Sequence, residues 1–220
     1  MRKITSISLF SGAGGLDVGF ELAGFEILYA NEFDHDAAEA WRINRPSRAH
    51  VMVEGDIRRY IDDLNKFHDV DVLFGGPPCQ GFSVAGKMDP NDERSKLVWL
   101  FMDAVEKVHP KIFIMENVSA LGLLEKWKDV REKIVKRGED LNYDVSFQVH
   151  CTSEYGVPEN RDRVIFIGVH KDTGRVEAFY EKLMEHKEVP QTAREVILSA
   201  GEYGADENPQ TCTANVPLAV

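Results

Sequence analysis

The chain has 220 residues, 43% of them hydrophobic, and a formal net charge of −11 at pH 7. This length can bury one full core, and the lack of any apolar run of about 18 residues excludes a membrane span. The sequence starts in a strand-like segment without signal-peptide anatomy, and its three cysteines are far apart without CxxC spacing. We therefore expect an intracellular, cytoplasmic protein without a disulfide framework or a metal site.

The first predicted unit is a strand from Ile4 to Phe10, a glycine-rich turn over 11–16 and a helix from Asp17 to Ala23. Glycines let a backbone approach a ligand closely, and the amino end of a helix attracts negative charge. A strand, a glycine turn and a helix in this order are typical of a nucleotide-type cofactor site in an open α/β sheet. A plain tight turn is the alternative, and it stays open at this point.

A second strand is predicted from Phe25 to Asn31, and it leads directly into Glu32. An acidic residue about 20 positions after the glycines lies where a pair of ribose hydroxyls would be bound. Taken alone, Glu32 is an ordinary surface residue, but its spacing from the glycines favours the ribose role. A helix from Asp36 to Asn44 follows, and Pro46 ends it.

A third short strand is predicted from His50 to Val53, and Asp56 and Ile57 come shortly after it. The carboxylate of Asp56 is well placed to accept a hydrogen bond from an adenine amino group, with Ile57 packed on the ring. Asp56 is equally suited to cap a helix that begins near Arg58. Position alone leaves the two roles open.

The chain is organised around a short buried strand over 72–74 and the corner that follows it. Glycine permits backbone angles that other residues resist, whereas proline fixes its own φ. Such a corner at a strand end presents a soft nucleophile, a cysteine, on a stiff turn. The residues of the corner are Gly75, Gly76, Pro77, Pro78 and Cys79. The small and polar segment from Gln80 to about Ser95 is predicted to be a mobile lid over a pocket.

An amphipathic helix is predicted from Leu97 to Val108, because its apolar residues recur at i, i+3, i+4 and i+7. The apolar segment Ile112–Met115 predicts a central parallel strand that ends in Glu116 and Asn117. A carboxylate after such a strand lies at the carboxyl edge of the sheet, where open α/β folds bind ligands. A further helix is expected from roughly Leu123 to Arg137.

Two closing strands are predicted over 145–149 and 164–169, and Arg161 and Arg163 lie between them. Two arginines one residue apart can be a solvated charge cluster. They can also give forked hydrogen bonds to a base edge and a phosphate. Helices over 176–186 and 192–198 are predicted for the rest of the chain.

Taken in order, these segments resemble the cytosine-C5 DNA methyltransferases from about Ile4 to His170. The most specific match is the nucleophile motif Gly76-Pro77-Pro78-Cys79-Gln80-Gly81-Phe82-Ser83, and Glu116-Asn117-Val118 and Arg161-x-Arg163 match two further catalytic motifs. The resemblance implies a Rossmann-like α/β fold, an open and mostly parallel sheet with helices on both faces, and S-adenosylmethionine as cofactor. The residues that match the family's cofactor site are Phe10, Ser11, Gly12, Gly14, Gly15, Glu32, Asp56, Ile57, Pro78 and Leu97.

The resemblance also implies a mechanism, in which a methyl group is transferred to C5 of a cytosine that has left the base stack of DNA. The Cys79 thiolate would add to C6 of the base. Glu116, buried at a strand end, would donate or share a proton at N3. Arg163 would hold the base O2, and Arg161 a phosphate or the loop. Substrate contacts are expected from Pro77, Gln80, Ser83 and Asn117.

The chain departs from the family pattern in two places. Glu159 stands where the family usually has glutamine, and its negative charge is expected to pair with an arginine and weaken the hold on substrate. The residues from Lys171 onward match neither the target-recognition domain nor the C-terminal segment that completes the family's cofactor pocket. We expect a catalytic and cofactor-binding domain over 1–170, and a C-terminal extension over 171–220 that leads toward an absent recognition domain.

The charge of −11 favours the same division, because DNA binding requires a basic surface that neutralises phosphates. We hypothesise that the chain is one subunit of a split enzyme, with the recognition domain on a second subunit, or a truncated form of a longer enzyme. The alternatives are a non-catalytic fragment that binds S-adenosylmethionine and an RNA cytosine-C5 methyltransferase. A nucleotide-dependent oxidoreductase would leave the Pro-Pro-Cys corner unexplained.

Overall fold

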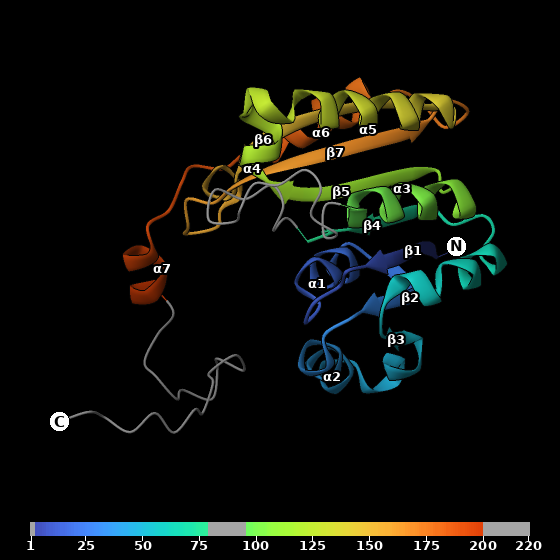
Figure 1. Cartoon of the computed structure of the whole chain (residues 1–220). Coiled ribbons are helices and arrows are strands. Elements are labelled where there is room, and N and C mark those ends of the chain that lie inside the picture. The colour runs from blue at the N-terminus through green and yellow to red at the C-terminus, as the bar shows by residue number, and fades with distance from the viewer. Residues whose placement is uncertain (1–2, 79–95, 200–220) are drawn as a thin grey trace. The chain divides into compact units, whose positions relative to one another are not determined.

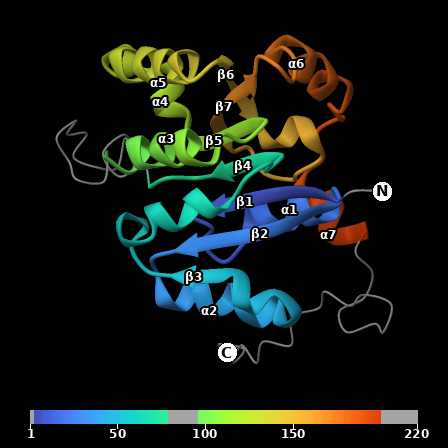
Figure 2. The same ribbon diagram turned by 90° about the vertical axis from the view of Figure 1, so that its right-hand side faces the viewer.

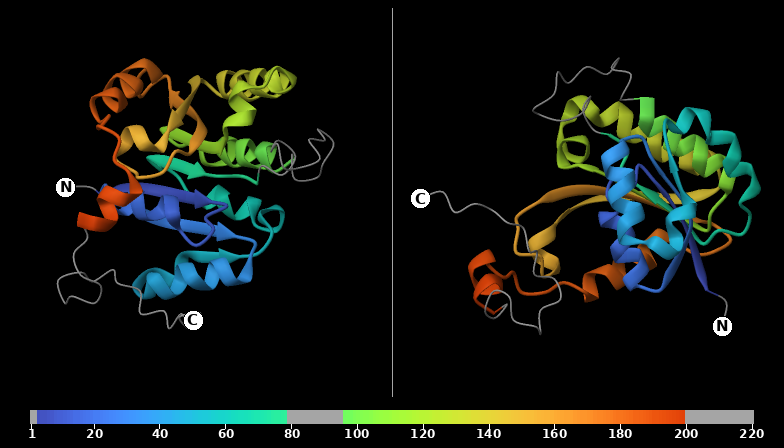
Figure 3. Two further views of the ribbon diagram at one scale, coloured as in Figure 1. Left: turned by 90° about the vertical axis from the view of Figure 1, so that its left-hand side faces the viewer. Right: turned by 90° about the horizontal axis from the view of Figure 1, so that it is seen from below.

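The structure is a computed structural model that describes residues 3–78 and 96–199. Its main feature is a sheet with the strand order β3-β2-β1-β4-β5-β7-β6, which runs from bottom to top in Figure 1. The strands keep this vertical order in the left view of Figure 3, which is turned about the vertical axis. The β1–β2, β1–β4, β2–β3 and β4–β5 pairs are parallel, and β5–β7 is antiparallel. The predicted mostly parallel sheet is therefore confirmed. The strands are β1 (Ile4–Leu9), β2 (Phe25–Glu32), β3 (Met52–Glu54), β4 (Val72–Gly75), β5 (Ile112–Val118), β6 (Tyr143–Cys151) and β7 (Asp162–His170).

Helices cover both faces of the sheet, as predicted, and Figure 2 shows α3, α4 and α5 on one side and α1 and α6 on the other. The largest core lies under α3 to α5 and includes Leu73, Phe101 and Phe113, all 0% exposed. Two smaller cores lie on the opposite face, one under α1 and α2 and one under α6. The helices are α1 (Gly15–Leu22), α2 (His35–Asn44), α3 (Lys96–Val108), α4 (Ser119–Leu123), α5 (Lys128–Asp140) and α6 (Val176–Glu185).

The third strand begins later than predicted. His50 and Val51 belong to a 3-10 turn over Pro46–Val51, and β3 comprises only Met52–Glu54. Proline at the start favours this turn, because its fixed φ suits the first helical position and its missing N–H is not needed there. The turn delivers Met52 to the edge of the sheet.

The single helix predicted over 123–137 is instead divided. Leu124, with φ −77° and ψ 133°, is extended, and a 3-10 turn over Glu125–Trp127 separates α4 from α5. The guanidinium of Arg131 donates to the carbonyls of Leu121 and Leu124 at 2.9 and 2.7 Å. The first bond satisfies a carbonyl that lacks a helical partner at the break, and the second adds to the bond of 3.1 Å that the Leu124 carbonyl accepts from the N–H of Trp127.

The chain divides into two units, one formed by 1–150 and 162–185 and the other by 151–161 and 186–220. In its described part the second unit contains a 3-10 turn over Thr152–Tyr155 and the helix α7 (Ala193–Ser199). Its two segments are joined by an ion pair of 2.7 Å between Lys187 and Glu154. The predicted domain boundary between residues 170 and 171 stays a prediction. No helix in the described part of the chain is long and apolar enough to cross a membrane.

Candidate active site

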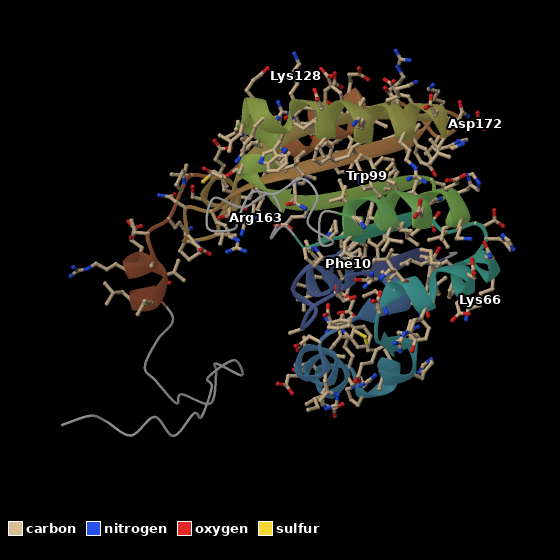
Figure 4. All side chains as sticks on the ribbon, in the orientation of Figure 1. Phe10, Lys66, Trp99, Lys128, Arg163 and Asp172 are labelled. Carbon is tan, nitrogen blue, oxygen red and sulfur yellow. The ribbon has the colours of Figure 1, made fainter. Side chains whose placement is uncertain are left out.

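The candidate site lies at the carboxyl edge of the parallel strands, where the loops after β1 to β4 meet. Figure 4 shows Phe10 and Arg163 at this edge and Asp172 at the opposite one. A pocket of about 500 Å³ opens here, which is a volume typical of small-molecule sites. It is lined by Phe10, Asn31, Glu32, Phe33, Asp56, Ile57, Arg58, Gly76, Pro78 and Leu97.

Phe10 turns the chain out of β1. Its φ of 55° lies in the left-handed region, so the strand ends at Leu9 and not at Phe10 as predicted. This backbone conformation is strained for a bulky residue and persists only where the surrounding structure enforces it. The turn leaves Phe10 in the wall of the pocket, which is consistent with strain held at a functional site.

Glu32 joins the glycine-rich turn to the end of β2. Its Oε2 accepts a hydrogen bond from the N–H of Gly12 at 2.7 Å, and its Oε1 accepts from the N–H groups of Phe33 and Asp34 at 2.8 Å each. A carboxylate has about four acceptor positions, so these three donors leave about one for a further donor. Glu32 is thus held by the backbone and still able to accept a hydroxyl.

Asn31 fixes the loop after β3 in the same way. Its side-chain amide, in a residue only 1% exposed, donates to the carbonyls of Val53 and Gly55 at 2.9 and 3.1 Å. The N–H of Gly55 in turn donates to the Glu32 carbonyl at 2.7 Å. Asn31 and Glu32 therefore connect the loops after β1 and β3.

Asp56 has the capping role that its position left open. Its Oδ1 accepts the N–H of Arg58 at 3.0 Å, at the start of a 3-10 turn over Ile57–Arg59. Its Oδ2 also lies 2.6 Å from Nη2 of Arg58, and this side-chain hydrogen bond lowers the pKa of Asp56. Both side chains line the pocket, so capping does not exclude the predicted contact with adenine.

A buried polar cluster lies beneath the glycine-rich turn. Asp17 is 0% exposed and accepts hydrogen bonds from the Ser8 hydroxyl at 3.0 Å and from the Trp41 indole N–H at 2.8 Å. The Ser8 hydroxyl also lies 2.9 Å from that of Ser11. Burial raises the pKa of Asp17, although the bonds from Trp41 and Ser8 oppose this shift. The cluster orients Ser11 from within the protein.

Arg45 holds the turn from the end of α2. It is 7% exposed, pairs with Glu21 at 2.8 Å, and donates to the Gly14 carbonyl at 3.1 Å. Its guanidinium also lies over the Trp41 ring at 4.7 Å. A Cβ on Gly14 would lie 2.5 Å from this guanidinium, and the φ of Gly14 is +91°. Only glycine suits this position.

The corner after β4 packs against the end of β5. The buried Asn117 donates its side-chain amide to the Pro77 carbonyl at 3.1 Å. A Cβ on Gly76 would lie 3.0 Å from Oε2 of Glu116, so a glycine lets the corner approach this carboxylate. Asn117 therefore positions the corner that leads to Cys79. Cys79, Gln80 and Ser83, and the predicted lid, lie outside the described residues.

Glu116 lies within β5 and not after it, because antiparallel pairing with β7 extends the strand to Val118. Its Oε1 is 2.7 Å from Nε of Arg163, and the two side chains are 27% and 23% exposed. The prediction of a buried carboxylate is wrong, since the pair is accessible from the edge of the sheet. The Arg163 guanidinium carries donors beyond the one that faces Glu116.

Arg161 belongs to the second unit and is exposed. Its carbonyl accepts a hydrogen bond from the N–H of Thr152 at 3.1 Å. Glu159 is exposed as well, and no ion pair between described residues includes it. Its expected pairing with Arg161 or Arg163 is therefore not observed, and the role of Arg161 stays a prediction.

A family model described as "C-5 cytosine-specific DNA methylase" matches residues 4–216. The chain belongs to this methylase family. It is 36% identical over 220 residues to the Type II methyltransferase M.NgoFVII of Neisseria gonorrhoeae, covering 100% of this chain and 57% of that protein. It is 39% identical over 176 residues to the Type II methyltransferase M.AquIA of a Picosynechococcus strain, covering 74% of this chain and 70% of that protein.

Solved structures of similar proteins support the same fold. One is a protein encoded within an Escherichia coli prophage and described as a DNA modification methyltransferase. It superposes with a TM-score of 0.63 at 32% identity, over 77% of this chain and 47% of that one. The chain spans about half the length of the curated relatives it matches, for example 57%, 47% and 48% of three of them.

The methylase family uses S-adenosylmethionine, and the pocket has features that suit this cofactor. Of the predicted cofactor residues, Phe10, Glu32, Asp56, Ile57, Pro78 and Leu97 line it. Two carboxylates, which can accept hydroxyl and amino donors, stand beside apolar side chains of the kind that can pack on a purine ring. Ser11, Gly12, Gly14 and Gly15 do not line the pocket. They belong to the turn and the start of α1 beside it.

Four residues that line the methylase pocket were not predicted to have a role there. These are Asn31, Phe33, Arg58 and Gly76. The sequence offered one indication for Phe33, since this aromatic residue directly follows the acidic Glu32. In the structure Phe33 is 74% exposed, which is unusual for a large apolar side chain. Within residues 3–78 and 96–199, no group of three or more histidine, cysteine or acidic residues could hold a metal ion.

Proposed function

We propose that this chain is the catalytic and cofactor-binding part of a DNA (cytosine-5-)-methyltransferase. Its substrate would be a flipped-out cytosine, methylated at C5 through a covalent bond between Cys79 and C6. One observation carries the proposal. Gly76 and Pro78 form part of the pocket wall, and Gly76 also faces the Glu116 carboxylate. The described end of the corner that leads to Cys79 therefore lies between the pocket and the Glu116 carboxylate.

S-adenosylmethionine, when bound, supplies a methyl group activated by its sulfonium. Glu32 would accept a hydrogen bond from a ribose hydroxyl, because one acceptor position of its carboxylate is left by the backbone donors. Ile57 and Leu97 would pack against the adenine, and Asp56 would accept its amino group. The places of the four side chains in the pocket wall support these roles.

Cys79, Glu116 and Arg163 would act on the base. Addition of the Cys79 thiolate to C6 places electron density on C5 and on N3. Glu116 would relieve the charge at N3 by donating or sharing a proton there. Arg163 would orient Glu116 through their 2.7 Å contact and offer its remaining donors to the base O2. Asn117 would hold the corner that sets the direction of the thiol.

Recognition of DNA would require a further part, either a second subunit or another segment. Two observations support this. The net charge of −11 provides little general attraction for phosphates, and the chain spans about half of its relatives. Apolar side chains of α1 are also open to contact, since Leu16, Val18 and Leu22 are 44%, 48% and 85% exposed.

The relatives' designation as Type II methyltransferases supports a role in a restriction–modification system.

The test is covalent trapping with DNA that contains 5-fluorocytosine, whose fluorine prevents release of the enzyme. The chain is incubated with S-adenosylmethionine and this DNA, alone and with a candidate chain that carries a target-recognition segment. We expect an adduct that resists denaturation and maps to Cys79, and none with the Cys79→Ser variant. Cofactor binding without an adduct in either mixture would contradict the proposal. An adduct from the chain alone would refute the need for a second part.

A further inference from the structure

The two carboxylates of the pocket are not equally available to a ligand. Glu32 is held by three backbone N–H groups and retains about one acceptor position. Asp56 is surrounded by one residue, Arg58. Its Oδ1 accepts from the backbone N and from Nε of Arg58 at 3.0 Å each, and its Oδ2 accepts from Nε and Nη2 at 3.0 and 2.6 Å.

The Nε–H of Arg58 is shared between the two oxygens, so three N–H groups make four contacts, two on each oxygen, and occupy about all of the acceptor positions of Asp56. An amino group that enters the pocket must therefore displace the Arg58 side chain from Asp56 or share an oxygen with it. Displacement is feasible, because the Arg58 side chain is 58% exposed and that of Asp56 is 20% exposed. An exposed pair of this kind adds little stability and exchanges readily with other partners.

The pair also changes what the pocket can recognise. A carboxylate alone accepts hydrogen bonds and therefore selects a purine with an amino group. A guanidinium donates, and it can bind the carbonyl oxygen of a keto purine. Since Arg58 and Asp56 both line the pocket, this wall presents a donor beside an acceptor.

We propose that Arg58 competes with the adenine amino group for Asp56 and so weakens the selection of the pocket for an amino purine over a keto purine. The inference rests on the proposed binding of an adenosyl cofactor and assigns Arg58 as a residue that tunes its specificity. Removing the guanidinium should increase the affinity for an adenosyl ligand by about two- to five-fold. This range corresponds to the free energy of an exposed ion pair.

The experiment is calorimetric titration of the chain with S-adenosylhomocysteine and with S-inosylhomocysteine, in which a carbonyl replaces the amino group. We expect the Arg58→Gln variant to bind the adenosyl compound about two- to five-fold more tightly than the unmodified chain. Its preference for the adenosyl over the inosyl compound should rise by at least the same factor. In an Asp56→Asn background, Arg58→Gln should no longer tighten the binding of the adenosyl compound.

The matched control is Arg59→Gln, which removes the same charge one position away. Arg59 is exposed, does not line the pocket and makes no hydrogen bond to Asp56 in the described part of the chain. An unchanged preference in Arg58→Gln, weaker adenosyl binding by it, or an equal gain in Arg59→Gln would overturn the inference while leaving the cofactor site intact. Failure of the unmodified chain to bind S-adenosylhomocysteine would overturn the proposed cofactor site, and the inference with it.

Discussion

Two acidic residues near the site differ in their exposure to solvent. Asp17, beneath the glycine-rich turn, is 0% exposed and is bonded to Ser8 and Trp41. Glu116, beside the corner after β4, is 27% exposed and pairs with Arg163. The first is enclosed by fixed donors and cannot exchange them without opening the core. The second can give up its partner to a substrate at small cost. Enclosure suits a residue that shapes a backbone, and access suits the proton transfer that we propose for Glu116.

The largest expected effect is on catalysis, from Glu116→Gln. The amide keeps the shape of the side chain and an acceptor for Arg163 but cannot supply the same proton. We expect methyl transfer to DNA to fall by at least about 100-fold. The free energy of unfolding should change by less than about 1 kcal/mol, because the pair is partly exposed. Methyl transfer is measured with the recognition part present, and unfolding in urea.

The proposed role of Glu116 requires that the variant lose methyl transfer but keep its free energy of unfolding. Binding of S-adenosylhomocysteine to Glu116→Gln should match that of the unmodified chain, which shows that the pocket is intact. A variant that loses several kcal/mol of stability, or one that keeps its transfer rate within about ten-fold, would mean that Glu116 is structural.

The next effect is on stability, from Asp17→Ala. This change leaves the Trp41 indole N–H without its acceptor and leaves the Ser8 hydroxyl with the Ser11 hydroxyl as its side-chain partner. A buried donor without a partner costs about 1–3 kcal/mol, and the lost bond from Ser8 adds about 1 kcal/mol, so we expect a loss of about 2–4 kcal/mol in the free energy of unfolding. Urea unfolding followed by circular dichroism measures it.

The control for this prediction is Asp36→Ala, at the corresponding place in α2. Asp36 also lies in the first turn of its helix but is exposed, so only its favourable contact with the helix dipole is lost. That loss is expected to be below about 1 kcal/mol. If the two variants unfold at the same urea concentration, the buried cluster does not support the turn.

The different surroundings of Asp17 and Glu116 also show what the sequence could predict. The places of Glu32 and Asp56 beside one pocket could be predicted from spacing, because the carboxyl ends of parallel strands meet at one edge and bring together residues that follow each strand. Asp17 had no such signal, since an acidic residue in the first turn of a helix is ordinarily exposed. Its burial depends on Trp41, 24 residues away.

Other features depended on distant contacts in the same way. Asn31 connects to carbonyls 22 and 24 residues along the chain, and no local pattern indicates these partners. Glu116 was expected after its strand, but the pairing with β7, which is far along the chain, extends the strand past it. The break at Leu124 was not predicted, because it is accompanied by a hydrogen bond from the side chain of Arg131, seven residues further along the chain. Local spacing predicted the elements, whereas tertiary packing set their ends and the charge environment.

The smallest expected effect concerns pH and sharpens the contrast for Asp17. Burial raises the pKa of its carboxyl in the folded protein, so between the unfolded and folded pKa values the folded state binds more protons. The contribution of Asp17 to stability is therefore retained below pH 4 and lost as pH rises through its raised pKa, by at most about 1.4 kcal/mol per pH unit.

In Asp17→Asn this loss is absent. The difference in unfolding free energy between the unmodified chain and Asp17→Asn should shift in favour of the variant as pH rises from 4 to 7. Carboxylates common to both proteins cancel in this difference. A slope of the opposite sign for Asp17→Asn would mean that the donors around Asp17 stabilise its charge by more than burial penalises it.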